Sequence, residues 1–225
     1  ERRVGPKIAV LTNIHEDHLD TYDGFDDYAN TKRSIARHLT AEDSLVINRD
    51  NAEAWRAANE TSARVTSFGS VRPSGEGFWI EGRTVCWETS DSAGCIELPD
   101  RFVYQGMHQR LNAAAAIAAA LARGADEAAI RGGLDQFEGV KDRSEFVAEI
   151  DGVLYVNDTS ATAPAAAIAA LDAYPGRNIH IIAGGFDKQL DLAPLGAALA
   201  SRAVTVLLLN GTATPRLMAA ITAQG

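Results

Sequence analysis

The sequence predicts an α/β protein in two domains, in which helices alternate with the strands of largely parallel sheets. Two observations support this prediction. Short apolar runs rich in β-forming residues recur between helical stretches rich in alanine, a pattern typical of parallel sheets with right-handed crossovers. A helix expected to end near Gly139 then leads into the segment 139–142, where we place a domain boundary. We therefore expect one domain over residues 1–141 and a second over residues 142–225.

The elements of the first domain follow from periodicity and from glycine and proline. The strand at 7–14 is a buried apolar run, and the region 78–98 alternates and carries aromatic residues, which favours antiparallel strands. Residues 69–77 hold Gly, Ser and Pro and are predicted to be a loop. The remaining predicted elements are strands at 44–48 and 64–68 and helices at 26–39, 52–59, 107–123 and 125–137.

The second domain is predicted to begin with a hairpin of strands at 145–150 and 153–157 around Asp151-Gly152. A helix should follow Pro164, because proline suits the first helical turn. Alternation then continues to the end of the chain, with strands at 178–183 and 204–209 and helices at 192–201 and 215–222.

Composition bounds the function. The formal charge of −9 argues against general nucleic-acid binding. The sequence contains no run of 18 apolar residues, so no membrane-spanning helix is predicted. Cys86 and Cys95 are too few for a disulfide framework and fit a reducing cytoplasm, where we expect the protein to act as a monomer. Position 1 is Glu and the chain opens almost directly into a strand, so we expect an internal piece of a longer protein.

The segment Asn157-Asp158-Thr159-Ser160-Ala161-Thr162-Ala163-Pro164 is the first candidate site, because a strand end, a polar turn and a helix start meet there. Open α/β sheets bind ligands at such strand ends, and helix N-termini attract anions. Taken alone, the segment equally fits simple capping of the helix by one of its polar side chains.

A second candidate site follows the first strand, where His18 stands among six carboxylates within 12 residues. Oxygen-rich surroundings with one imidazole suit Mg²⁺ or Mn²⁺. The alternative is a solvated acidic loop, which is common before helices. On the next helix Lys32 is either functional, which would require burial or a covalent change in its charge, or a surface partner of Asp26 or Asp27.

Two further candidates lie in the second domain. Arg143 has the planar fork that suits phosphate, although an exposed surface arginine is the simpler interpretation. The loop Gly184-Gly185-Phe186-Asp187-Lys188 places flexible backbone and a cation after a strand, where an anion could bind, although an ordinary turn would look the same. The chain lacks the Gly-x-x-x-x-Gly-Lys-Ser/Thr spacing of a phosphate-binding P-loop.

Taken together, these segments resemble the Mur ligases of peptidoglycan synthesis, and among them the type that adds glutamate to UDP-N-acetylmuramoyl-L-alanine. The resemblance spans nearly the whole chain and rests on several motifs in order. They are Asn13-Ile14-His15-Glu16-Asp17-His18-Leu19-Asp20, Tyr28-Ala29-Asn30-Thr31-Lys32, Gly106-Met107-His108-Gln109-Arg110-Leu111-Asn112, Arg143 fifteen residues before Asp158, Asn157 to Thr162, and Gly184-Gly185-x-Asp187-Lys188.

The resemblance implies a role for each matching residue. His18 and a carbamoylated Lys32 would hold a catalytic Mg²⁺. Asn112 would contact the adenine of ATP, Arg143 a phosphate and Asp158 the ribose, while Lys188 and Thr162 would hold the incoming glutamate. Two positions depart from the family pattern, since Gln109 replaces an asparagine and Ser160 replaces a lysine. We also expect the loops that contain Thr162 and Lys188 to follow strands of the same parallel sheet.

The resemblance further implies a partial central ATPase domain over residues 1–141, followed by a truncated Rossmann-like ligase domain over 142–225. The family P-loop should precede residue 1, so the 225-residue chain alone is expected to be inactive. The full enzyme would phosphorylate the substrate carboxylate with ATP and let the glutamate amine displace phosphate. Ser160 keeps an L-glutamate-adding variant open. Another Mur-type or folylpolyglutamate-type ligase, or a non-catalytic nucleotide-binding module, remains an alternative.

Overall fold

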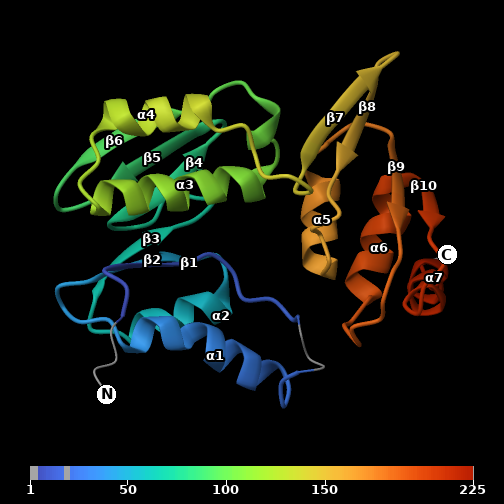
Figure 1. Cartoon of the computed structure of the whole chain (residues 1–225), viewed down its shortest axis with the longest axis horizontal. Coiled ribbons are helices and arrows are strands. Elements are labelled where there is room, and N and C mark those ends of the chain that lie inside the picture. The colour runs from blue at the N-terminus through green and yellow to red at the C-terminus, as the bar shows by residue number, and fades with distance from the viewer. Residues whose placement is uncertain (1–4, 18–20, 225) are drawn as a thin grey trace. The chain divides into compact units, whose positions relative to one another are not determined.

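The computed structural model describes residues 5–17 and 21–224, which form two compact units (Figure 1). The first unit contains the chain up to His15 and the segment Asp26–Glu138. The second contains Gly139 onward together with the short segment Glu16–Phe25. The chain therefore passes from one unit to the other between Glu138 and Gly139, and the acidic loop after the first strand is assigned to the second unit.

The first unit is built on a six-stranded sheet whose strands lie in chain order. The first four strands pair in parallel and the last three pair in antiparallel fashion, as the sequence predicts. The strands are β1 (Ile8–Leu11), β2 (Ser44–Asn48), β3 (Arg64–Phe68), β4 (Gly77–Glu81), β5 (Thr84–Glu88) and β6 (Ala93–Glu97).

Helices cover both faces of this sheet (Figure 1). On one face lie α3 (Met107–Ala122) and α4 (Glu127–Gln136), and on the other α1 (Phe25–Arg37) and α2 (Ala52–Trp55), which continues as a 3₁₀ turn at Arg56–Asn59. Another 3₁₀ turn, Phe102–Tyr104, precedes α3. The alanines 113–115 of α3 are buried in the core beside Phe68 and Phe78, because small side chains let the helix approach the sheet closely.

A buried arginine joins α1 to the segment that follows β2. The Arg33 side chain is 6% exposed, and its guanidinium pairs with Glu53 at 2.9 Å and with Glu60 at 3.1 Å. It also donates to Asn30. Removing one member of such a buried ion pair leaves an uncompensated charge, so this cluster fixes how α1 packs.

The second unit contains a parallel pair of strands with helices, as expected for a Rossmann-like domain. The pair is β9 (Ile179–Ala183) with β10 (Ala203–Leu208), and the helices are α5 (Pro164–Asp172), α6 (Ala193–Arg202) and α7 (Thr214–Thr222). A small core of leucines holds the helices against this pair: Leu171, Leu195, Leu199 and Leu217.

The hairpin of β7 (Glu145–Ile150) and β8 (Val153–Asn157) is a separate two-stranded sheet. The expected turn at Asp151-Gly152 is confirmed, with φ of 51° and 76° at the two residues. The expectation that β8 and β9 share one parallel sheet is wrong for the described residues, since β8 pairs with β7 alone. Pairing β8 with its sequence neighbour forms the hairpin at little loop-closure cost.

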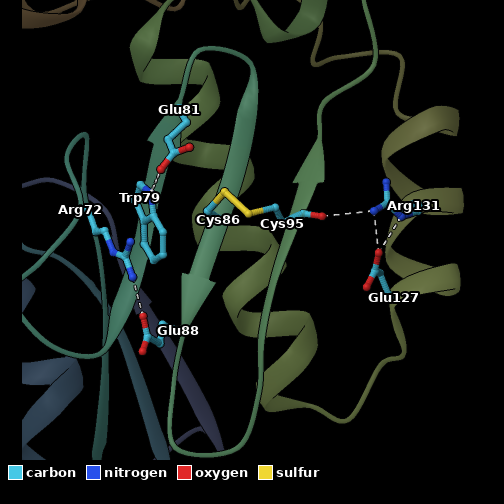
Figure 2. The surroundings of a disulfide bond; sticks show 8 residues. All are labelled: Arg72, Trp79, Glu81, Cys86, Glu88, Cys95, Glu127 and Arg131. Carbon is cyan, nitrogen blue, oxygen red and sulfur yellow. Dashed lines mark hydrogen bonds and ion pairs between the residues drawn. A yellow bond between two sulfur atoms is a disulfide. The ribbon is translucent and has the colours of Figure 1, made fainter.

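The two cysteines are joined, which the sequence did not predict. Cys86 of β5 and Cys95 of β6 are direct partners in the antiparallel register and form a disulfide (Figure 2). Figure 2 also shows the surroundings: Arg72 lies over the Trp79 ring at 4.8 Å on one side, and Arg131 of α4 donates to the Cys95 carbonyl at 3.2 Å on the other. The bridge therefore ties the edge strand β6 to a buried neighbour.

Across residues 5–17 and 21–224, every helix is too short or too polar to cross a bilayer.

Candidate functional site

The turn between β8 and α5 is not closed by a capping side chain. The N-cap of α5 is Ala163, which has no side chain able to cap, and Pro164 occupies the first turn as predicted. The interpretation that Asp158, Thr159, Ser160 or Thr162 caps this helix is therefore wrong. The side chains of Asp158 and Thr162 instead bond to other segments of the second unit.

Asp158 is bound to the turn that carries Arg143. Its Oδ1 accepts a hydrogen bond from the backbone N–H of Ser144 at 2.8 Å, so the two predicted nucleotide-binding residues lie in adjoining segments. Tyr174 stands nearby: burial raises its pKa to about 12, and the negative charge of Asp158 adds to the shift. The Arg143 side chain is exposed and forms no ion pair within the described chain. An anion could therefore reach the guanidinium.

Lys188 and Thr162 meet directly. The Lys188 Nζ donates to the Thr162 hydroxyl at 3.1 Å and to the Asp17 carboxylate at 2.8 Å. All three residues belong to the second unit, because the segment Glu16–Phe25 is part of it. The alternative pairing of Lys188 with Asp187 or Asp191 is not what the structure shows. A lysine that already holds a carboxylate, beside a threonine hydroxyl, is chemically suited to hold the carboxylate of a ligand.

The loop that carries Lys188 is held in place by side chains from the segment that follows β10. Asp187 accepts from Arg216 at 2.7 Å and from the Gln189 N–H, and these bonds lower the pKa of its carboxyl. The Asp187 N–H donates to the hydroxyl of Thr212 at 2.8 Å. Gly184 has φ of 128°, where a Cβ would lie 2.7 Å from the Leu209 carbonyl, so glycine is required there. The loop thus presents Lys188 on a defined backbone.

The predicted metal segment is described only in part. His18 lies outside the described residues, as does Asp20. The described start of this segment is held by two asparagines at the end of β2 and just after it: Asn48 donates to Asn13 at 3.0 Å, and Asn51 exchanges two hydrogen bonds with the backbone of Ile14. Among residues 5–17 and 21–224, no three His, Cys, Asp or Glu side chains are grouped as metal ligands would be.

The other two predicted residues of the first unit are exposed. Lys32 lies on α1 with its Nζ 5.2 Å from the centre of the Tyr28 ring, so the two side chains share one face of the helix. Asn112 lies in the second turn of α3 and donates to Gln109 at 3.3 Å. The helix begins after Gly106, whose φ of 80° favours glycine.

Four residues that contribute to the site carry no role predicted from the sequence. Asp17 and Lys188 are 171 residues apart, and no local pattern could have paired them. Asn48 is only the last residue of a predicted strand, and Asn51 lies outside the predicted elements. Asn157 was quoted within a motif without a role, yet its side chain contacts the turn before Arg143. A polar residue at the last position of a strand was the available signal for Asn48 and Asn157.

The family model described as Mur ligase middle domain matches residues 1–120. A UDP-N-acetylmuramoylalanine–D-glutamate ligase from Roseiflexus sp. is 38% identical over 231 residues, which cover 98% of this chain and 49% of the relative. The enzyme of the same name from Acidobacterium capsulatum is 38% identical over 218 residues, covering 96% and 47%. The chain spans about half the length of these curated relatives.

A solved structure gives the same fold. The MurF ligase from Thermotoga maritima in complex with ADP aligns with a TM-score of 0.65 at 21% identity, over 98% of this chain and 56% of that one. At this identity the likeness concerns the fold.

Proposed function

The chain belongs to the Mur ligase family, and from this we propose that its full-length protein is an ATP-dependent ligase that adds glutamate to UDP-N-acetylmuramoyl-L-alanine. The observation that carries the proposal is the contact of Lys188 with Thr162 and a carboxylate, in a chain 38% identical to D-glutamate ligases across nearly its whole length. The protein would act in the cytoplasm, as a monomer, in peptidoglycan synthesis.

The first half-reaction would use residues from both proposed domains, 1–141 and 142–225. Asp158 would accept hydrogen bonds from the ribose hydroxyls of ATP, Arg143 would hold a phosphate, and Asn112 would contact adenine. ATP would then phosphorylate the substrate carboxylate to an acyl phosphate.

The second half-reaction would form the amide bond. Lys188 and Thr162 would hold a carboxylate of glutamate, leaving its amine free to attack the acyl phosphate. The tetrahedral intermediate would collapse with loss of phosphate. Fixed cations and donors are the groups that stabilise charge developing on crowded oxygens.

His18 and a carbamate on Lys32 would hold Mg²⁺. A carbamate turns an ammonium into an oxygen ligand of the kind that Mg²⁺ prefers, and the exposed Lys32 amine is accessible to carbon dioxide. Bound there, the ion would neutralise charge between the phosphates.

The proposed role of Asp158 in ATP binding is tested with Asp158→Ala in the full-length protein. Loss of a ribose contact should raise the KM for ATP by on the order of tenfold, since hydrogen bonds to charged groups contribute about 1.5–3 kcal/mol. Asp172→Ala, which removes a surface carboxylate paired with Arg202 in the same unit, is the matched control. An unchanged KM for ATP in Asp158→Ala would refute the assignment.

The reaction itself separates the rival functions. Phosphate release from ATP that requires both UDP-N-acetylmuramoyl-L-alanine and glutamate supports the proposal, and comparing the two glutamate enantiomers tells a D-adding enzyme from an L-adding variant. Release that requires a different amino acid points to another ligase of the family. Binding of ATP without any turnover would identify a non-catalytic nucleotide-binding module.

A further inference from the structure

The turn before β7 is held in a conformation that non-glycine residues rarely adopt. Asp142 has φ of 62° and Ser144 φ of 43°, so Arg143 lies between two residues in the left-handed region. Such a conformation is strained for a residue with a side chain and persists only where its surroundings fix it. The Arg143 N–H closes the turn by donating to the Val140 carbonyl at 3.1 Å. The direction of the Arg143 side chain therefore depends on this backbone.

The side chain of Asn157, the last residue of β8, fixes the turn. Its Nδ2 donates to the Asp142 carboxylate at 2.9 Å and to the Glu145 carboxylate at 3.1 Å. The same Glu145 oxygen accepts from the Asp142 N–H at 2.9 Å. One amide nitrogen thus bridges two carboxylates that would otherwise repel each other.

Further bonds join the two segments on either side of Asn157. The Asn157 Oδ1 accepts from the Thr159 N–H at 3.2 Å, which shapes the turn before α5. The Ser160 N–H donates to the Asp142 carbonyl at 2.8 Å, and the Ser144 N–H donates to Asp158. Asn157 therefore stands where the Arg143 turn and the Asp158 turn meet.

We propose that Asn157 is a positioning residue that holds the Asp142–Ser144 turn and thereby aims the guanidinium of Arg143 at the phosphates of ATP. The inference rests on the proposed nucleotide-binding function of Arg143 and Asp158, and adds a residue for which that function assigns no role. An amide is required at this place because it supplies donors without charge. A carboxylate there would face Asp142 and Glu145 as a third anion, and an alkyl group would leave both unbridged.

The alternative is that Asn157 only stabilises the β7–β8 hairpin, in which it is the register partner of Glu145. The two roles can be told apart, because a residue that only stabilises the hairpin would have the same effect as any other substitution that weakens the hairpin. Ile150→Ala is the matched control, since Ile150 and Val153 form the pair at the opposite end of the same hairpin. It weakens the hairpin without touching the Arg143 turn.

The experiment compares Asn157→Ala, Arg143→Ala and the double variant in the full-length protein. We expect Asn157→Ala to raise the KM for ATP on the order of tenfold and to have almost no further effect in the Arg143→Ala background, because residues acting through one another are non-additive. Hydrogen exchange of peptides covering residues 140–146 should be faster in Asn157→Ala, while peptides covering β9 and β10 should be unchanged. Asn157→Asp should give the larger effect on both measurements.

Each contrary result identifies what fails. Unchanged hydrogen exchange at residues 140–146 would show that Asn157 does not hold the Asp142–Ser144 turn. A KM effect that persists undiminished in Arg143→Ala, or an equal effect of Ile150→Ala, would overturn positioning through Arg143. If Arg143→Ala itself leaves the KM for ATP unchanged, the proposed nucleotide role fails and the functional half of this inference with it. Should Asn157→Ala not fold, Glu145→Ala removes the acceptor shared by Asn157 and Asp142 and must show the same pattern.

Discussion

The Lys188 Nζ lies 3.1 Å from the Thr162 hydroxyl, although the strands that lead into their two loops belong to different sheets. The same ammonium holds the Asp17 carboxylate at 2.8 Å. The lysine side chain is 25% exposed, so it is screened from bulk water more than a surface lysine is. A carboxylate already occupies the position in which we propose that glutamate binds.

If Lys188 holds glutamate, then Lys188→Ala in the full-length protein should raise the KM for glutamate far more than the KM for ATP. A lost charge-assisted contact of about 1.5–3 kcal/mol corresponds to roughly a tenfold to hundredfold change. Steady-state kinetics with each substrate varied measures it. Arg202→Ala, which breaks a surface ion pair with Asp172 in the same unit, is the control and should change neither constant. Small, equal changes in both constants for Lys188→Ala would rule out the glutamate role.

Lys32 gives the second prediction. Lys32→Ala should abolish ligase activity of the full-length protein, and short-chain carboxylic acids should restore part of it by replacing the carbamate. Lys32→Arg should be equally inactive, because a guanidinium keeps the positive charge and cannot form the carbamate ligand. Arg37→Ala, which removes an exposed cation from the same helix, is the comparison. Full activity of Lys32→Ala without added acid would contradict the carbamate.

The helices and strands could be predicted because they depend on local sequence pattern. Which strands pair with each other, and which side chains meet across the fold, could not be predicted. The β7–β8 hairpin followed from Asp151-Gly152, and α5 from Pro164. The separation of β8 from the β9–β10 sheet depends on long-range pairing that no local signal encodes. The strand at 7–14 was predicted too long, since β1 ends at Leu11 and the backbone of Ile14 binds the Asn51 side chain instead of a strand.

The candidate site shows the same division. Motif spacing selected Thr162 and Lys188, which the structure brings together, and Arg143 and Asp158, whose segments it joins through Ser144. The sequence could not reveal Asp17 as the partner of Lys188 or the bridge made by Asn157, because such contacts depend on where folded loops lie. His18 falls outside the described residues, so its role stays a prediction.

Asp43 gives a prediction on pH. The Thr40 N–H and hydroxyl donate to its carboxylate at 2.7 and 2.8 Å, and Lys7 pairs with it at 3.0 Å. These bonds lower the pKa of Asp43 to about 2, and the bond from the Thr40 backbone N–H contributes most to the shift. Because the folded pKa lies below the unfolded value of about 3.9, the stabilisation is fully present above pH ~4 and is lost as the pH falls toward 2.

We therefore expect Asp43→Asn to lower stability at neutral pH and to flatten the acid dependence between about pH 4 and pH 2. Urea midpoints measured at intervals of pH test this. Asp151→Asn, at the exposed turn of the β7–β8 hairpin, controls for the loss of one acidic side chain. Parallel curves for Asp43→Asn and the unchanged protein across this window would show that the Thr40 and Lys7 bonds do not stabilise the fold.

The disulfide between Cys86 and Cys95 gives the last prediction. It closes a short loop, with a sequence separation of 9, so loop-closure entropy limits its contribution to about 2–3 kcal/mol. Reduction should lower the urea midpoint of unfolding by a corresponding amount, and β6 should loosen first because it is the edge strand of the sheet. Tryptophan fluorescence reports on this region, because Trp79 pairs with Cys86 in the β4–β5 register and Trp87 lies on β5 beside it. A double variant with Cys86→Ala and Cys95→Ala is the control, because its midpoint should not respond to reductant. If reductant shifts the double variant as much as the unchanged protein, or shifts neither, the bridge does not stabilise this sheet.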